Sequence, residues 1–324
     1  MASDWTAARF PHVPAAAGHY ESYYLKACHP DEPLGLWIRY TVHKRPGKPA
    51  KGSLWCTVFE AGGPHAAKVT LPEPAAPEGE LIRIGEASFA PGRVVGEALD
   101  CAWELTFEDP AEPFLHLPRT WMYRAKLPRT KTLSPWPQAT FSGRVRVGER
   151  EIVVDRWPGM VGHNWGAEHA ERWIWMHGTR FAEAPDAVLD VAIGRVRLGP
   201  VTTPWVGNGL LLLDGERIRL GGLGKARATR VEETPQECRF ALAGRDVEVE
   251  GRVGAPRERF VCWVYADPDG PEHHTANCSI ADMELVVRRR GRPERRLRVE
   301  AGAAYELGMR ERDHGYEAQP FPDG

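Results

Sequence analysis

The 324-residue sequence lacks any apolar segment long enough for a membrane helix. No run reaches the roughly 18 consecutive apolar residues needed to span a bilayer, so we expect no transmembrane segment. The stretch from Met1 to Phe10 has an acid at position 4 and lacks the basic flank and apolar core of a secretory signal, which favours a cytoplasmic protein. With 42 basic and 44 acidic side chains, the net charge of −2 indicates no nucleic-acid partner.

The sequence also lacks the short motifs of common catalytic and cofactor sites. It has no Gly-x-Ser-x-Gly elbow, no phosphate-binding Walker loop and no His-Glu-x-x-His, and Gly221-Gly-Leu-Gly224 lacks the spacing of a dinucleotide fingerprint. The six cysteines are widely spaced with no Cys-x-x-Cys pair, which favours buried reduced thiols over disulfides or zinc. Histidines and a glutamate at positions 163, 168, 169 and 177 form no compact ligand motif. We therefore expect neither a metal nor a cofactor.

Long helical periodicity is nearly absent, whereas alternation of apolar and polar residues recurs along the whole chain. In Leu99–Phe107 every odd position is apolar, the pattern of a half-buried strand. Proline and glycine concentrate between such runs, which predicts an all-β protein of antiparallel sandwiches or barrels. Because the chain is too long for one ordinary core, we expect two domains, at 1–160 and 161–324, that meet at a glycine-punctuated segment.

That segment, Trp157–His177, contains four of the 12 tryptophans and three of the 12 histidines. Both residue types combine an apolar body with a polar tip, which suits the wall of a pocket for an apolar ligand. Strand geometry over its second half places Trp173, Trp175 and His177 on one face. The alternative is that these rings only fill a barrel core.

Two further clusters are candidates for the same pocket. Around Glu21 and Tyr23 the chain is aromatic, and in the following run Trp37 and Arg39 share a strand face. Glu21 and Arg39 could form a buried pair that lines a cavity, or Arg39 could stack on Trp37 at the surface. A loop-like aromatic stretch that begins at Trp121 could cap the mouth of a pocket or close the bottom of a barrel.

The Glu21–Ala27 and Leu36–Val42 runs, and above all Gly162-His-Asn-Trp-Gly166 followed by Trp173-Ile-Trp175, resemble the superfamily of tandem lipocalin-like domains. This group includes carotenoid 1,2-hydratases (hydroxyneurosporene synthases), tocopherol cyclases and fungal Diels–Alderases. The resemblance implies two packed lipocalin-like β-barrel or sandwich domains, with an apolar pocket near their junction to which the His-Asn-Trp-Gly segment contributes. It also implies chemistry without a redox cofactor on polyene-like substrates.

The predicted function is that of a cofactor-independent hydratase, isomerase or cyclase acting on an apolar isoprenoid, polyene or polyketide-like molecule. The catalytic candidates are His163 as acid–base group with Asn164 and His177 as orienting groups, and the ligand-binding candidates are Trp165, Trp173, Trp175, Glu21, Tyr23, Trp37 and Arg39. One departure matters: carotenoid hydratases have an acidic residue immediately before this motif, whereas this chain has Gly162. His163, Glu168, Asp155 or Asp190 are the alternative proton donors. The other hypotheses are a non-catalytic carrier of an apolar ligand and a structural β module whose pocket has closed.

Overall fold

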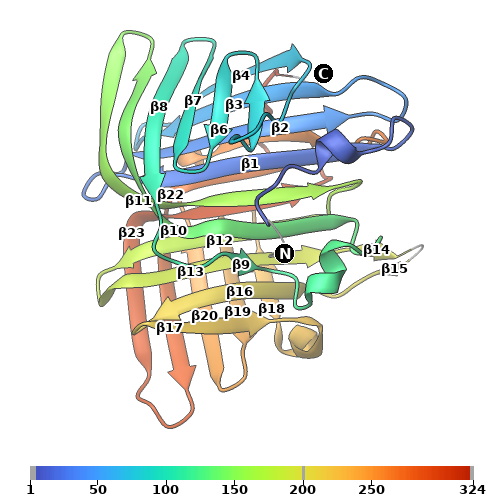
Figure 1. Cartoon of the computed structure of the whole chain (residues 1–324). Coiled ribbons are helices and arrows are strands. Elements are labelled where there is room, and N and C mark those ends of the chain that lie inside the picture. The colour runs from blue at the N-terminus through green and yellow to red at the C-terminus, as the bar shows by residue number, and fades with distance from the viewer. Residues whose placement is uncertain (1–4, 199–200, 322–324) are drawn as a thin grey trace.

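The computed structural model describes residues 5–198 and 201–321, and these form a nearly all-β protein (Figure 1). Two large antiparallel sheets contain almost every strand, which confirms the predicted fold class. The short helices are all of the 3-10 type: η1 (Phe10–His12), η2 (Thr120–Tyr123), η3 (Leu223–Ala228) and η4 (Arg257–Arg259). Within the described residues, no helix is long and apolar enough to cross a membrane.

The first sheet is formed by the N-terminal half of the chain. Its strand order is β4-β3-β2-β1-β11-β10-β8-β7-β6-β5, and β9 pairs separately with β10. The strands are β1 (His19–Cys28), β2 (Gly35–Lys44), β3 (Lys51–Phe59), β4 (His65–Pro72), β5 (Ile82–Ile84), β6 (Ala87–Ala90), β7 (Arg93–Ala98), β8 (Cys101–Glu108), β9 (Phe114–Leu115), β10 (Thr130–Val147) and β11 (Arg150–Gly166).

The second sheet is formed by the C-terminal half, in the order β17-β16-β13-β12-β23-β22-β20-β19-β18, with β21 paired to β22. Its strands are β12 (Arg172–Phe181), β13 (Ala184–Arg195), β16 (Val206–Leu213), β17 (Glu216–Gly221), β18 (Arg230–Glu233), β19 (Glu237–Ala243), β20 (Val247–Gly254), β21 (Val261–Ala266), β22 (Glu272–Arg289) and β23 (Arg295–Met309). The short strands β14 (Arg197–Leu198) and β15 (Val201–Thr202) pair with each other. The chain leaves the first sheet at Gly166 and enters the second at Arg172; the exact division at 160/161 stays a prediction.

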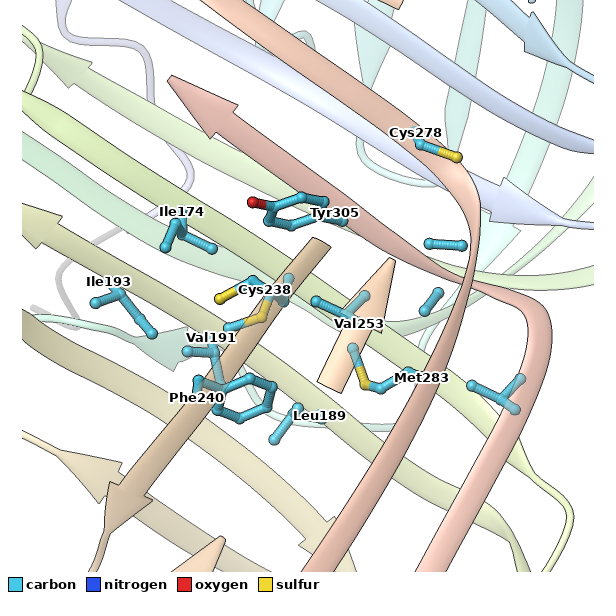
Figure 2. Packing of buried hydrophobic residues seen from close by; sticks show 14 of the residues in the cluster. Ile174, Leu189, Val191, Ile193, Cys238, Phe240, Val253, Cys278, Met283 and Tyr305 are labelled. Atoms are coloured by element: carbon cyan, nitrogen blue, oxygen red, sulfur yellow. The ribbon is translucent and has the colours of Figure 1, made fainter. Parts of the chain in front are cut away.

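Each sheet has its own hydrophobic core. In the second sheet, alternate residues of β12 and β13, such as Ile174, Leu189 and Val191, pack against Phe240 and Met283 (Figure 2). Phe181 belongs to this core as well, because a bulge after Thr179 shifts it off the face of Trp173 on which simple alternation would place it. All six cysteines are free and buried, as expected for reduced thiols that pack as small apolar side chains.

Strands β1 and β2 are buried along their whole length, because both of their faces are covered. One face contributes to the core of the first sheet, and the other packs against the second sheet. At this junction Trp37 stacks on Trp263 with ring centroids 6.4 Å apart, and Trp55 meets the same ring edge-on at 5.0 Å. The Lys26 ammonium donates a hydrogen bond to the Gly302 carbonyl at 2.7 Å across the junction. The two halves therefore share a buried contact that is largely aromatic.

Candidate functional site

A cavity of about 410 Å³ lies where the two sheets meet. Its walls come from β1 and β2 of the first sheet, from β12, β13, β16 and β23 of the second, and from the chain between Leu117 and Thr132. Aliphatic and aromatic side chains provide most of the lining, so the cavity suits a largely apolar molecule. Its volume is typical of small-molecule pockets. The hypothesis of a structural β module whose pocket has closed therefore does not fit this cavity.

Polar and ionisable groups gather at one end, here called the polar end: Tyr20, Arg39, His169, Trp173, Tyr265 and Glu306. The buried Glu306 carboxylate is held by three donors. Trp173 Nε1 donates to Oε1 at 2.9 Å, while Asn277 Nδ2 and the Tyr265 hydroxyl donate to Oε2 at 2.9 and 3.2 Å. Burial raises the pKa of the Tyr265 hydroxyl well above its ordinary value, so it remains a donor. These three donors therefore fix the orientation of the Glu306 carboxyl group at the polar end.

His169 is the imidazole of the polar end. Its ring lies between Tyr20, stacked at 3.9 Å, and Trp173, at 5.4 Å between centroids. Asp267 accepts hydrogen bonds at 2.7 Å from both the backbone N–H and Nδ1 of His169. Burial raises the pKa of Asp267, but its hydrogen bonds and proximity to His169 outweigh burial and hold the pKa below its ordinary value. An ionised Asp267 makes Nδ1 the protonated nitrogen, and this leaves Nε2 as the basic atom.

Arg39 brings a buried cation to the polar end. Its guanidinium carbon lies 4.0 Å from the centre of the Tyr265 ring, a close cation–π contact. A smaller void of about 10 Å³ adjoins the cavity here and is lined in part by Arg39, Thr41 and His169. Arg39 Nε, Thr41 Oγ1 and His169 Nε2 are buried and have no hydrogen-bond partner among the described residues. The void is about the size that one water molecule occupies, and these atoms are the partners that such a water needs.

An apolar part of the cavity reaches the surface. Leu117, Met122, Ile193 and Val206 line it, together with Leu127 and Leu223. The last two are exposed, at 55% and 66% of their surface, so the cavity reaches the surface beside these two side chains, and we call this part its mouth. Leu127 lies after η2, and Leu223 begins η3.

Strand alternation decides which predicted residues face the cavity. On β1, Tyr20 and Tyr24 line the cavity, whereas Glu21 and Tyr23 point into the other side of the sheet. On β2, Trp37 and Arg39 line the cavity as predicted. Glu21 therefore does not pair with Arg39.

The His-Asn-Trp-Gly segment is divided between the two faces of β11. Asn164 lines the cavity, and its Oδ1 accepts a hydrogen bond from Ser22 Oγ at 2.5 Å. His163 and Trp165 lie on the opposite face, where His163 Nε2 is 2.8 Å from Glu21 Oε1 and its ring stacks on Tyr23 at 4.1 Å. His163 is fully buried there and does not line the cavity, so its predicted acid–base role stays a prediction without support from this placement.

The Glu21–His163 pair is a buried contact of the N-terminal half. Burial raises the pKa of Glu21, but hydrogen bonds from His163 and His19 outweigh it and lower the pKa to about 2. Burial lowers the pKa of His163 more than Glu21 raises it. Backbone N–H groups of Arg9 and Phe10 also donate to the carboxylate, at 2.9 and 2.7 Å. Glu21 therefore anchors the N-terminal segment to the sheet.

Trp173 and Trp175 line the cavity as predicted, whereas His177, farther along β12, does not. His177 Nε2 lies 3.2 Å from the Pro137 carbonyl, and burial together with the Lys26 ammonium lowers its pKa to about 4. The predicted orienting role of His177 stays a prediction. Trp175, two residues earlier on the same strand, donates a hydrogen bond from Nε1 to Asp190 Oδ1 at 3.4 Å.

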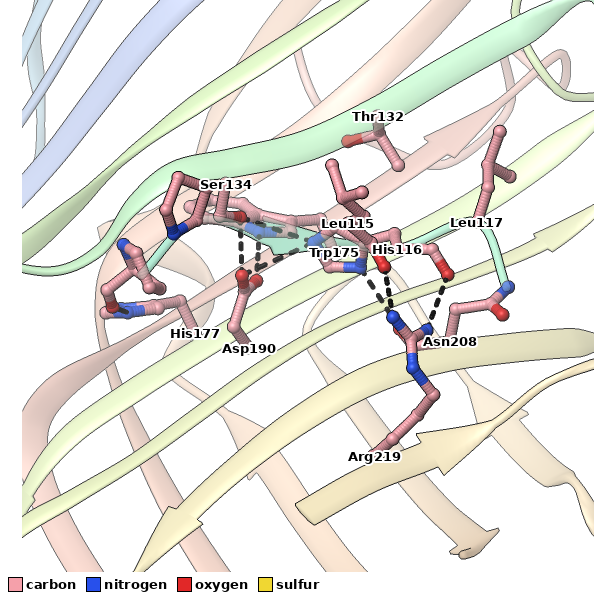
Figure 3. Close-up of polar contacts among 12 residues, drawn as sticks. Leu115, His116, Leu117, Thr132, Ser134, Trp175, His177, Asp190, Asn208 and Arg219 are labelled. Carbon is pink, nitrogen blue, oxygen red and sulfur yellow. Dashed lines mark hydrogen bonds and ion pairs between the residues drawn. The ribbon is translucent and has the colours of Figure 1, made fainter. Parts of the chain in front are cut away.

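Asp190 is the centre of a polar network that supports the cavity wall from behind (Figure 3). Ser134 Oγ donates to its Oδ2 at 2.5 Å, and His116 Nε2 lies 3.3 Å from the same oxygen. Burial raises the pKa of Asp190, but His116 outweighs it and the pKa lies below its ordinary value. His116 Nδ1 bonds the Asn208 carbonyl at 3.2 Å, so this network ties the chain before β10 to the second sheet.

Three groups of His, Cys, Asp or Glu side chains among the described residues have donor atoms close enough to share a metal ion. One of them, His169, Asp267 and His273, adjoins the polar end. The hydrogen bond of His169 to Asp267 already explains their approach. Burial lowers the pKa of His273 to about 4, so it packs as a neutral ring. We therefore assign this trio to hydrogen bonding and packing.

Sequence reasoning missed several residues of the polar end. Tyr265 and Glu306 lie far along the chain from Arg39, and Asp267 supports the site only through His169. Strand alternation predicts that Glu306 and Ala304 lie on the same face of a strand. It does not predict that this face lies toward β2, which depends on how the two sheets pack together. His169 lies within the predicted segment, where nothing local distinguished it from His163 or His177.

Comparison with known proteins places the chain in a family. Two Mycobacterium tuberculosis proteins, uncharacterized proteins MT0513 and Rv0493c, are each 31% identical to it over 300 residues, covering 86% of this chain and 84% of theirs. The chain belongs to the same family as these mycobacterial proteins. No family model matches it.

The solved structures that resemble this family member share its fold. CghA covers 93% of the chain and 90% of its own length with a TM-score of 0.60 at 11% identity. Kievitone hydratase from Nectria haematococca covers 91% and 89% with a TM-score of 0.51 at 9% identity. These likenesses span both halves of the chain and confirm the resemblance to the tandem lipocalin-like superfamily in fold.

Proposed function

We propose that this protein binds an apolar small molecule of isoprenoid, polyene or polyketide type in the junction cavity and acts on it by acid–base catalysis. The observation that carries the proposal is the cavity itself: a mostly apolar volume of about 410 Å³ with a carboxylate, an imidazole and a guanidinium gathered at one end. An apolar pocket with a few convergent polar groups is typical of a small-molecule site. The fold shared with a hydratase agrees with such chemistry.

His169 and Glu306 are the proposed catalytic residues, because both line the cavity. Asp267 is a positioning residue that keeps Nδ1 of His169 protonated and Nε2 available. The aromatic faces of Trp173 and Trp175 stabilise positive charge that develops on a polyene. None of these steps requires a redox cofactor.

The small void beside Arg39 favours hydration over isomerisation or cyclisation, since a water held there lies next to His169. In a hydration, an acid transfers a proton to one carbon of a double bond, and the water oxygen bonds to the other carbon. The water gives one of its two protons to His169 Nε2, and His169 returns a proton to the acid, so the sum is the addition of one water. The alternative is a non-catalytic carrier, which the apolar majority of the lining favours.

The test combines ligand identification with isotope labelling. Ligands copurified from the host are identified by mass spectrometry, then incubated with the protein in oxygen-18-labelled water. We expect labelled product with wild-type protein, ligand binding without product for His169→Gln, and normal turnover for the matched control His12→Gln, a histidine exposed on the surface. Unchanged ligand with every variant would establish the carrier instead. Absence of any apolar ligand, and no binding of added polyenes, would overturn both.

A further inference from the structure

The mouth of the cavity combines exposed apolar side chains with exposed cations. Trp121, Leu127 and Leu223 are 63%, 55% and 66% exposed, and they are three of the six large apolar side chains that are exposed among the described residues. Leu127 and Leu223 also line the cavity, and Trp121 precedes the lining residue Met122. Figure 1 shows η2, in green, and η3, in yellow-orange, on the same side of the molecule. An exposed apolar patch of this kind marks an interaction site.

Five basic residues accompany these side chains, and the segments that carry them have no acidic residue. No Asp or Glu occurs in 113–131 or in 217–231. The exposed cations on η2, η3 and the chain next to them have no carboxylate partner within the part of the chain that the structure describes: Arg119, Arg124, Lys126, Lys225 and Arg227. Elsewhere most exposed arginines pair with carboxylates, as Arg230 does with Glu250 at 2.9 Å. We call these five cations and the three apolar side chains the mouth patch.

We propose that the mouth patch docks onto an anionic lipid bilayer, so that an apolar ligand passes directly between the membrane and the cavity. Aromatic and aliphatic side chains that project among Lys and Arg are the chemistry of interfacial membrane binding. The unpaired cations complement negatively charged headgroups, while Trp121 and the two leucines enter the acyl boundary. The inference rests on the proposed apolar ligand for its purpose, but the docking itself can be tested without any ligand.

The experiment is sedimentation of the full chain with phosphatidylcholine vesicles, with and without phosphatidylglycerol. We expect binding that depends on phosphatidylglycerol and weakens with added salt. Each surface cation contributes a factor of about five to the binding constant, so Arg124→Gln/Lys126→Gln should weaken binding about thirtyfold. Trp121→Ser should also weaken binding, and this loss should persist at high salt because it removes an apolar contact. None of these three residues lines the cavity, so ligand copurification should persist in both variants.

The matched controls lie at the far end of β10 and on its neighbour β11. Arg144→Gln/Arg146→Gln removes two exposed charges about 45 Å along β10 from Thr130, at about 3.3 Å per residue. Val153→Gln removes an exposed apolar side chain from β11, opposite Arg144 in the register. Both controls should bind vesicles as the wild type does.

Three results would overturn the docking proposal: wild-type protein that ignores anionic vesicles, patch variants that bind like the wild type, or controls that lose binding equally. Retention on heparin without vesicle binding would assign the patch to an acidic macromolecule and would also overturn it. Vesicle binding with an empty, inactive cavity would refute the proposed function alone, so the two failures are distinguishable. Circular dichroism of each variant confirms that it is folded.

Discussion

Protonation of His177 should destabilise the fold below neutral pH. The buried imidazole has its pKa lowered to about 4, mainly by burial and then by the Lys26 ammonium, whereas an unfolded chain has the ordinary value of 6.5. Below about pH 6.5 the unfolded state therefore binds more protons than the folded state, and stability falls as the pH falls, until it levels off below about 4. The two pKa values imply a loss of about 2 kcal/mol between pH 7 and pH 5, and about 3 kcal/mol in all.

The assay is urea unfolding of wild-type protein and His177→Gln at pH 7 and pH 5. The wild type should lose about 2 kcal/mol more stability than the variant over this interval, because only the wild type protonates this site on unfolding. Other buried histidines, such as His273, titrate in both proteins and cancel in the difference. The exposed His12, replaced in His12→Gln, provides a control that should follow the wild type. Equal pH dependence in the wild type and His177→Gln would refute the reasoning.

A second perturbation separates the two causes of the shift. Lys26→Met removes the ammonium that opposes the charge on His177, so the pKa of His177 should rise toward its ordinary value and the acid sensitivity should decrease. The same variant loses the hydrogen bond to Gly302, so a lower stability at pH 7 is expected as well. An NMR titration of the His177 ring follows the pKa directly. An unmoved pKa would leave burial as the entire cause.

Three further outcomes follow from single contacts. Gly162→Ala should cost about 1 to 3 kcal/mol in urea unfolding, because its Cβ would meet the Tyr24 ring, 2.6 Å from Cε1, and Tyr24→Ala should relieve most of that cost. Asp190→Asn should cost about 1 to 3 kcal/mol in urea unfolding, since it disturbs the buried hydrogen bonds that the Asp190 carboxylate accepts from Ser134 and Trp175; the exposed Asp186, replaced in Asp186→Asn, is the matched control. The lowered pKa of Glu21 contributes about 3 kcal/mol of stability, which is lost as the pH falls from about 4.5 to about 2. Glu21→Gln should lack this contribution to the pH dependence, and acid unfolding of the two proteins measures the difference.

The fold was predictable because its signal is local. The alternation in Leu99–Phe107 corresponds to β8, whose odd positions are buried and whose even positions are mostly exposed. The same rule placed Trp37 and Arg39 together, and both line the cavity. In a strand with one solvent-exposed face, the alternation of polar and apolar residues shows which face is buried, so the fold class can be predicted from the sequence.

The cavity face was not predictable, because β1 and β2 are buried on both sides. Alternation separates Glu21 and Tyr23 from Tyr20 and Tyr24, but it does not tell which set faces the partner sheet. That choice depends on how the second sheet docks, and this is determined by contacts such as Trp37 on Trp263, over two hundred positions apart. The polar end was not predictable for the same reason: Arg39, His169 and Glu306 come from three separate regions of the chain, and only the docking of the two sheets brings them together.

Gly162 shows how one substitution in a motif changes the chemistry around it. At the position where the resemblance leads us to expect an acidic residue, this chain has no side chain, and the Tyr24 ring occupies that space. Burial raises the pKa of Tyr24 well above its ordinary value, so the group beside Asn164 is a neutral phenol that donates a hydrogen bond and does not transfer a proton readily. A hydrogen-bond donor activates a carbonyl or hydroxyl more effectively than an isolated double bond. We therefore expect the natural ligand to carry an oxygen function close to Tyr24, with its apolar remainder directed toward Leu127 and the mouth of the cavity.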